Sequence, residues 1–277
     1  MPAPKSSDLS ALRGLILDMD GVLWEGDSPL PGMPDFFRFL RERGIRFILA
    51  TNNASLTVAS YVQKLARMGV AVEPEEILTS ATATAEYLKS VARPGERAYI
   101  IGEEGLIRAV ESAGVQAAGP DALDADYVIC GMDRGLNWNK LANAAINLNR
   151  GARFIGTNSD VTFPTERGIS HGNGAILAAL TAASGIRPKV IGKPYPAIMR
   201  MAVARLGLPK ARIAAVGDRL ETDILGAKNA GLKSILVLTG VTSRKMLRKN
   251  RVRPTWVIDG LPALQAVWAA RGRQTAG

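Results

Sequence analysis

Polar side chains that could do chemistry directly follow four short apolar runs of this sequence. In chain order they are Asp18 and Asp20 after GLIL, Thr51 and Asn52 after RFILA, Lys193 after KVIG, and Asp218 with Asp223 after IAAVG. Two carboxylates at the end of a hydrophobic strand are costly unless a cation neutralises them, and Mg²⁺ binds carboxylate oxygens together with phosphate oxygens. Hydroxyl, amide and ammonium groups donate hydrogen bonds to phosphate. These residue types therefore match a site for a metal-bound phosphate.

Each of these residues also has a purely structural interpretation. Asp and Gly are common in turns, so the D-x-D-G stretch could simply end a strand. Thr51 could cap a helix, Lys193 could be a solvated loop lysine, and Asp218 and Asp223 could stabilise the positive end of a helix. All four groups occur, in order, at predicted strand ends. This coincidence favours one common site over four unrelated turns and caps.

The elements that would position these side chains alternate between strand and helix. Apolar runs of strand length occur at 15–17, 45–53, 97–102, 127–131, 153–158, 188–194, 212–218, 233–240 and 255–260. Helical patterns lie between them at 33–44, 55–69, 104–114, 139–151, 172–185, 195–208 and 221–231, and the stretch 75–91 is typical of a strand or turn that leads into a helix. This alternation predicts parallel sheets covered by helices. Ligands of such sheets bind at the carboxyl ends of the strands.

The number of predicted strands is too large for one modest sheet, so we expect two α/β domains. The first would consist of residues 1–80 and 188–277, and the second of residues 81–187. A chain of 277 residues is also longer than a single domain of modal size.

The composition is that of a globular protein, with 47% hydrophobic and 22% charged residues. No apolar run reaches about 18 residues, so no membrane-spanning helix is expected. The first ten residues lack the apolar segment of a secretory signal. Cys130 is the only cysteine, which excludes internal disulfides and is typical of the reducing cytoplasm.

The formal net charge is +10, and six basic residues with no acidic one gather in RKMLRKNRVR, residues 244–253. A nucleic-acid-binding surface is one interpretation of this segment. A solvated helix face followed by a loop is the other, and we favour it because no aromatic residue interleaves the basic ones. A positive surface also attracts small anionic substrates, so net charge alone does not distinguish a nucleic-acid-binding protein from an enzyme with an anionic substrate.

Taken in order, the motifs D-x-D-G-V, T-N-N after a strand, G-K-P and G-D-x-x-x-T-D resemble those of the haloacid dehalogenase superfamily of phosphotransferases. The large α/β segment between the second and third motifs resembles the cap of the type IIA subgroup. That subgroup includes nitrophenyl-phosphatases, nucleotide monophosphatases, phosphoglycolate phosphatases and pyridoxal phosphatases. The resemblance covers residues 12–264 and implies a Rossmann-like parallel-sheet core with an inserted α/β cap.

The resemblance also implies roles for the strand-end residues. Asp18 would be the nucleophile that forms an aspartyl-phosphate, and Asp20 the general acid and base. Mg²⁺ would be held by Asp18, the main-chain carbonyl of Asp20, Asp218 and, directly or through another ligand, Asp223. Thr51, Lys193 and the backbone amide of Asn52 would bind the phosphoryl oxygens.

Substrate selection would fall to the cap, where we expect candidates among its polar residues: Asp133, Asn158, Asp160 and His171. Each could equally be a turn or helix cap. His171 is the only histidine, and no R-H-G signature surrounds it, which disfavours a phosphohistidine mechanism.

The expected function is Mg²⁺-dependent hydrolysis of a small phosphate monoester. Phosphoglycolate, glycerol phosphate, nucleotides, sugar phosphates, pyridoxal phosphate and nitrophenyl phosphate are the substrate classes. A phosphomutase that uses the same intermediate is the nearest enzymatic alternative, and a basic nucleic-acid-binding protein is the alternative outside enzymes. We expect a cytoplasmic protein without nucleic-acid or membrane partners, and the resemblance also allows a homodimer formed through the cap.

Overall fold

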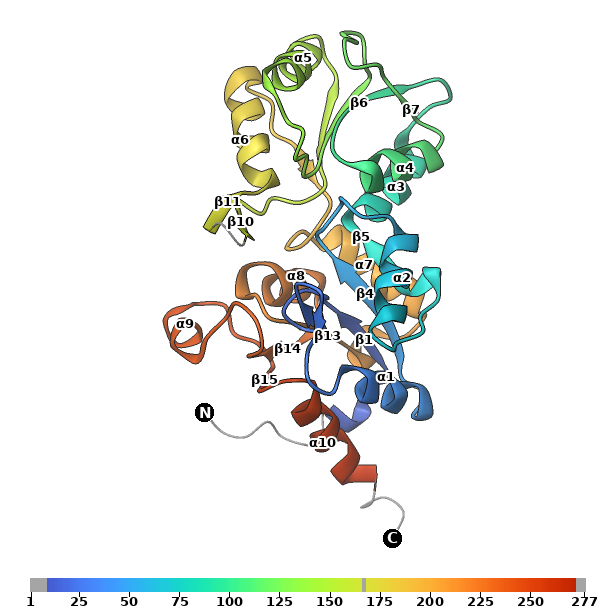
Figure 1. Ribbon diagram of the computed structural model, residues 1–277, viewed down its shortest axis with the longest axis vertical. Helices are drawn as coiled ribbons and strands as arrows, with labels where there is room; N and C mark the ends of the chain where they lie inside the picture. Colours follow the sequence, from blue (N-terminus) through green and yellow to red (C-terminus); the bar gives the residue numbers. More distant parts are fainter. Residues whose placement is uncertain (1–8, 166–167, 273–277) are drawn as a thin grey trace. The chain divides into compact units, whose positions relative to one another are not determined.

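Six short strands form the sheet that carries most of the predicted site residues (Figure 1). The computed structural model describes residues 9–165 and 168–272. The strand order is β15-β14-β13-β1-β4-β5, and the pairings from β15 through β4 are parallel. The strands are β1 (Gly14–Leu17), β4 (Arg46–Thr51), β5 (Ile77–Thr79), β13 (Ile213–Gly217), β14 (Lys233–Val237) and β15 (Trp256–Ile258). The predicted parallel α/β sheet is confirmed.

Central strands of this sheet are apolar because they are covered on both faces. Every residue of β1 and β13 is buried, as expected of a strand with neighbours on both sides and helices above and below. The associated helices are α1 (Met33–Glu42), α2 (Val58–Arg67), α7 (Pro196–Leu206), α8 (Leu225–Ala230), α9 (Arg244–Lys249) and α10 (Leu261–Gly272). Helix α7 packs against β1 and β4. Helix α1 ends just before Gly44, whose φ of 60° suits the predicted glycine stop.

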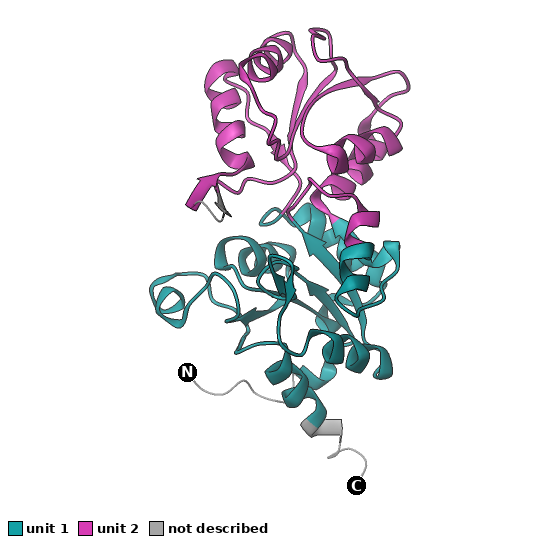
Figure 2. Cartoon of the chain, in the orientation of Figure 1, with its two compact units in different colours: residues 1–51, 62–78, 193–277 teal, residues 52–61, 79–192 magenta. Residues whose placement is uncertain are grey.

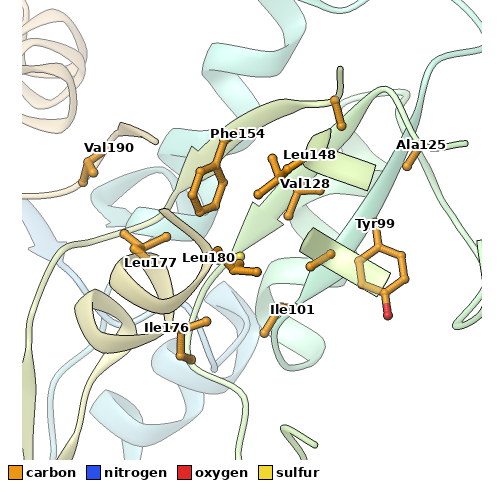
Figure 3. Close-up of a cluster of buried hydrophobic side chains, with 13 residues drawn as sticks. Tyr99, Ile101, Ala125, Val128, Leu148, Phe154, Ile176, Leu177, Leu180 and Val190 are labelled. Carbon is orange, nitrogen blue, oxygen red and sulfur yellow. The ribbon is translucent and has the colours of Figure 1, made fainter. Parts of the chain in front are cut away.

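A second parallel sheet has the order β12-β9-β8-β6-β7. Its strands are β6 (Arg97–Ile101), β7 (Gln116–Ala117), β8 (Tyr127–Cys130), β9 (Arg153–Gly156) and β12 (Lys189–Val190), and its helices are α3 (Ser80–Val91), α4 (Glu104–Ser112), α5 (Trp138–Asn149) and α6 (Asn173–Ser184). Figure 3 shows the core of this sheet, where side chains of the strands meet those of α5 and α6. Cys130, the only cysteine, is buried in this core.

The described residues also form two antiparallel hairpins and several short helical turns. The hairpins are β2 (Trp24–Glu25) with β3 (Ser28–Pro29), and β10 (Thr162–Thr165) with β11 (Gly168–His171). Single helical turns are η1 (Leu9–Ala11), η2 (Pro74–Glu76), η3 (Lys210–Arg212) and the π-helical turn η4 (Leu220–Ile224). Neither hairpin was predicted, because each contains strands of two to four residues without a clear alternation. Within 9–165 and 168–272, no helix is long and apolar enough to cross a membrane.

The chain divides into two compact units (Figure 2). Unit 1 contains residues 1–51, 62–78 and 193–277, and unit 2 contains residues 52–61 and 79–192. The predicted second domain, 81–187, lies inside unit 2, which also contains residues 52–61, 79–80 and 188–192. Segment 52–61 groups with unit 2 because, for example, the carbonyl of Ser55 accepts a hydrogen bond from the N–H of Gly105.

One predicted strand belongs to a different sheet from the one expected. Residues 188–194 were assigned to the first domain, but β12 pairs with β9 of the second sheet. The cause is packing, since Val190 is buried in the core of Figure 3 beside Phe154 and Leu177. After the second sheet, the chain therefore returns to unit 1 at Lys193 and not at residue 188.

Candidate active site

Three neighbouring strands of the first sheet end in predicted site residues. Asp18 follows β1, Asp218 follows β13, and Thr51 is the last residue of β4. The order β13-β1-β4 puts their carboxyl ends side by side. Parallel strands thus deliver the three side chains to one edge of the sheet, where ligands of open α/β sheets bind.

Three carboxylates meet at this edge. Asp18, Asp218 and Asp223 each offer an oxygen, and these oxygens lie within 4.8 Å of one another. Asp223 comes from the turn η4, which begins three residues after β13. Asp218 and Asp223 are each about 1% exposed, and the side chain of Asp18 is 12% exposed. The cluster is therefore almost closed to water, with its opening at Asp18.

Lys193 joins the cluster through its side chain. Its Nζ lies 2.6 Å from Oδ1 of Asp18, 2.6 Å from Oδ1 of Asp223 and 3.0 Å from the carbonyl oxygen of Ala50. The lysine is 3% exposed, so these bonds replace its water. We predicted that Lys193 follows a strand of the same sheet, and this was wrong because β12 belongs to the second sheet. The lysine nevertheless reaches the expected carboxylates.

The charges of the cluster are unevenly balanced, since one lysine faces three carboxylates. Burial raises the pKa of Asp18, and the neighbouring charge of Asp223 raises it further, against the opposing effect of Lys193. Burial also raises the pKa of Asp218 to about 6, with Asp223 as the next cause. Burial alone would lower the pKa of Lys193, but the charges of Asp18 and Asp223 more than offset it and hold the ammonium protonated. The cluster lacks positive charge.

The surroundings of Asp218 fit a cation. Its Oδ2 accepts a hydrogen bond of 2.7 Å from the N–H of Val241, whereas its Oδ1 is buried and has no hydrogen-bond partner among the described residues. A Cβ on Gly21 or Gly240 would lie 2.6 Å or 2.1 Å from Oδ2, so both positions require glycine. Gly21 also has a φ of 79°. An orphaned carboxylate oxygen beside two further carboxylates is the donor set of a hard divalent ion.

Thr51 and Asn52 lie at the point where the chain passes from unit 1 to unit 2. Thr51 is 3% exposed. The carbonyl of Asn52 accepts bonds from the Ser80 hydroxyl at 2.6 Å and the Asn158 amide at 2.9 Å, and its own side-chain amide donates to Asp160 at 3.1 Å. The side chain of Asn52 is thus engaged inside unit 2, which is consistent with a phosphate contact through its backbone N–H. That contact stays a prediction.

Asp20 lies apart from the three clustered carboxylates and is exposed. Its Oδ1 accepts a hydrogen bond of 2.8 Å from Nε1 of Trp24, which is 1% exposed. Sequence reasoning gave Trp24 no role. The only sequence signal for this contact was the position of Trp24 four residues after Asp20, with Gly21, a residue type that tolerates positive φ, between them.

The predicted cap residues differ in their surroundings. Asp133 is 6% exposed, and its carboxylate accepts the N–H of Gly135 at 2.8 Å and pairs with Nζ of Lys140 at 2.7 Å. Contacts of this kind are typical of a carboxylate that stabilises a turn. Asn158 and Asp160 are bonded to Asn52, as described above. His171 lies in the exposed strand β11 opposite Thr162. The part that these residues play in substrate selection stays a prediction.

The basic segment 244–253 forms α9 and the loop that follows it. Leu247 is buried against Leu220, Ile224 and Leu236, and the basic residues of α9 are exposed, as expected of a solvated helix face. Arg244 pairs with Asp259 at 2.6 Å, and Arg253 bonds to backbone carbonyls of the same segment. Binding of nucleic acid by this segment stays an untested alternative.

Comparisons with known proteins agree with the geometry of the site. Residues 15–116 match the family model of haloacid dehalogenase-like hydrolases, and residues 190–264 match a model of HAD-like hydrolases. The first range contains Asp18, Asp20 and Thr51, and the second contains Lys193 and the remaining two carboxylates.

Three relatives cover nearly the whole chain. The 5'-nucleotidase YutF of Bacillus subtilis is 36% identical over 91% of this chain and 97% of its own length. The 4-nitrophenylphosphatase of Thermotoga maritima is 37% identical, with a TM-score of 0.88 over 94% of this chain and 98% of that chain. A glycerol phosphate phosphatase of Mycobacterium tuberculosis in complex with magnesium is 36% identical, with a TM-score of 0.84 over 93% of this chain and 78% of that chain. The chain belongs to the haloacid dehalogenase-like hydrolases, in the capped type IIA phosphatase subgroup that its motifs resemble.

Proposed function

We propose that this phosphatase hydrolyses phosphate monoesters of small metabolites with Mg²⁺ and through an aspartyl-phosphate on Asp18. The observation that carries the proposal is the cluster of Lys193 with three carboxylates at the carboxyl edge of the sheet. We assign the catalytic core to unit 1, and the cap to unit 2.

In the first step, an oxygen of Asp18 attacks phosphorus and the bond from phosphorus to the ester oxygen breaks. Asp20 gives a proton to that oxygen, which leaves as an alcohol. In the second step, Asp20 takes a proton from water, and the water attacks the aspartyl-phosphate and restores Asp18 with release of phosphate. Covalent catalysis of this kind divides one difficult hydrolysis into two easier steps.

Lys193 holds the nucleophile in place and stays charged during the reaction. Its bond to Oδ1 of Asp18 fixes that carboxylate and leaves the other oxygen for attack. Lys193, Thr51 and the backbone N–H of Asn52 donate to the phosphoryl oxygens, whose negative charge grows in the transition state. Asp18, Asp218, Asp223 and the carbonyl of Asp20 would hold Mg²⁺, which when bound supplies positive charge for the carboxylates and the phosphate.

The names of the relatives support a small phosphate ester as substrate. They include a nucleotidase, a nitrophenylphosphatase and a glycerol phosphate phosphatase, whose leaving groups differ widely in size and charge. Catalytic residues of this chain contact the phosphoryl group, which these esters share. We therefore propose that unit 2 selects among leaving groups, with Asn158, Asp160 and His171 as candidates, whereas the contacts of Asp133 with Gly135 and Lys140 favour its alternative role in a turn. A phosphomutase would differ only in that a second substrate hydroxyl takes the place of water.

The test replaces the nucleophile. Asp18→Asn should abolish hydrolysis of every ester in a panel, because an amide cannot form the acyl-phosphate, and the far-ultraviolet circular dichroism should be unchanged. Asp35→Asn is the matched control, since Asp35 lies on the surface with its side chain 64% exposed. Wild-type activity should vanish with chelator and return with Mg²⁺. Turnover of Asp18→Asn within about tenfold of wild type would exclude Asp18 as the nucleophile.

A further inference from the structure

The strongest unassigned contact near the site is the hydrogen bond that Trp24 donates to Asp20. The bond is 2.8 Å long, and its donor belongs to a side chain that is 1% exposed, whereas the acceptor is exposed. A buried, rigid ring thus holds a carboxylate that otherwise faces solvent. The length is in the normal range for a hydrogen bond from a nitrogen donor to an oxygen acceptor.

The tryptophan is itself held from two sides. The N–H of Gly21 donates to the carbonyl of Trp24 at 2.8 Å, which closes the loop between Asp20 and the ring. Nζ of Lys64 lies 4.7 Å from the centroid of the indole, and it donates to the carbonyl of Gly26 in the turn of the same hairpin at 2.7 Å. The positive charge over the ring attracts its π face. The loop, the hairpin and α2 therefore fix the direction of the indole N–H.

The chemistry of indole makes this contact directional. Indole Nε1 carries a hydrogen and can only donate. While the bond to Oδ1 exists, it favours a proton carried by Asp20 on the other oxygen, Oδ2, because a protonated oxygen is the weaker acceptor. Among the described residues, the structure gives Oδ2 no hydrogen-bond partner. The carboxyl group has one oxygen anchored and one oxygen open for proton transfer.

We propose that Trp24 is a positioning residue that orients the Asp20 carboxyl group for proton transfer to the leaving group. This inference rests on the proposed function, in which Asp20 is the general acid of the first step. As Asp18 attacks phosphorus and the ester bond breaks, the electron pair of that bond stays on the leaving oxygen, which takes the proton from Oδ2 of Asp20. Trp24 donates its bond throughout and exchanges no proton.

The consequence depends on the leaving group. An alkoxide such as that of glycerol is a poor leaving group and needs the proton, whereas nitrophenolate is a stable anion and leaves without it. The ratio kcat/KM covers the steps up to release of the leaving group, so it isolates the first step from hydrolysis of the intermediate. Loss of orientation should lower kcat/KM for glycerol phosphate and spare nitrophenyl phosphate.

The experiment compares Trp24→Phe with wild type on these two esters in the presence of Mg²⁺. Phenylalanine keeps a ring below Lys64 and removes only the donor. We expect kcat/KM for glycerol phosphate to fall about 10- to 10²-fold, part of the 10²- to 10⁴-fold that general acid catalysis contributes, and kcat/KM for nitrophenyl phosphate to change less than about threefold. Trp256→Phe is the matched control, because Trp256 is also buried, in the same unit, with Lys233 above its ring.

The Asp20→Asn background provides a second readout. Because Asp20→Asn already lacks the acid, adding Trp24→Phe should not lower kcat/KM for glycerol phosphate any further relative to nitrophenyl phosphate. The effects of the two substitutions on kcat/KM should therefore be strongly non-additive. If Trp24→Phe does not fold, benzothienylalanine at position 24 replaces the N–H by sulfur in a ring system of the same shape.

Failure of the inference and failure of the proposed function have different signatures. If wild type hydrolyses neither ester, the proposed function fails. If wild type hydrolyses both and the loss in Trp24→Phe is equal for the two esters, absent, or additive with Asp20→Asn, Trp24 supports the fold and does not position the acid.

Discussion

Replacing Asp218 by asparagine tests the electrostatic cost of the carboxylate cluster without any measurement of activity. In the metal-free protein, burial and then the charge of Asp223 raise the pKa of Asp218 from 3.8 to about 6. At about 1.4 kcal/mol for each pH unit, this difference corresponds to roughly 3 kcal/mol by which the ionised carboxylate destabilises the fold at pH 7. Because asparagine carries no charge, metal-free Asp218→Asn should be more stable than wild type by up to about 3 kcal/mol.

The sign of the pH dependence follows from proton binding. Between pH 3.8 and about 6 the folded wild type binds more protons at Asp218 than the unfolded chain does. The contribution of this group to stability is therefore fully present below pH 3.8 and is lost as the pH rises through about 6. The advantage of Asp218→Asn over wild type should grow across the same interval.

Thermal unfolding in chelator, followed by circular dichroism from pH 4 to 8, measures this difference. A gain of 3 kcal/mol corresponds to roughly 6–12 °C in Tm for a chain of this size. At a hundredfold excess over Kd, Mg²⁺ should stabilise wild type by about 2.7 kcal/mol and so raise its Tm, and it should leave the Tm of Asp218→Asn nearly unchanged. Asp35→Asn, on the surface of α1, should follow wild type throughout. A metal-free Asp218→Asn that is no more stable than wild type at pH 7 would refute the electrostatic reasoning.

Two further substitutions separate chemistry from support of the fold. Lys193→Met should lower kcat for every ester by about 10²-fold or more, because it removes the ammonium that is bonded to both Asp18 and Asp223; a loss confined to some esters would contradict this. Asp133→Ala should lower the free energy of unfolding by about 1–3 kcal/mol, since it leaves the Gly135 N–H and Lys140 unpaired, and should keep the ranking of kcat/KM across esters. A changed ranking would mean that Asp133 contacts the substrate.

The sequence was sufficient to locate the side chains that depend only on strand order. Asp18, Thr51 and Asp218 each follow or end a buried apolar run, and parallel strands bring their ends to one edge of a sheet. Right-handed crossovers leave few other ways to assemble such runs. For these residues, the local apolar pattern and the topology of the sheet predict the same location.

The position of Lys193 depends on information that the local pattern lacks. A two-residue strand fits the edge of either sheet, and β12 pairs with β9 because Val190 finds an apolar core there. The G-K-P motif nevertheless identified the lysine, since its long side chain reaches Asp18 and Asp223 from outside the sheet. The motif was more informative than the strand assignment.

Trp24 and Asn52 show a second limit of sequence reasoning. The bond between Trp24 and Asp20 requires the positive φ of Gly21 and a hairpin with strands of two residues, neither of which has a periodic signal. Asn52 follows a strand of the first sheet, yet its hydrogen bonds to Ser80 and Asp160 group it with unit 2. Hydrogen bonds between residues distant in sequence are settled by tertiary structure alone.

The charge of the site has the opposite sign to the charge of the chain. The sequence carries a formal net charge of +10, whereas the cluster sets three carboxylates against one lysine. Two unit charges 4 Å apart interact by about 4 kcal/mol at an effective dielectric constant of 20, while salt screens exposed charges beyond about 8 Å. The exposed basic residues of α9 can therefore speed the arrival of a phosphate but cannot offset the repulsion inside the cluster. A divalent cation bound at the carboxylates themselves would offset that repulsion, which is the physical reason for our proposal that Asp18, Asp218 and Asp223 hold one.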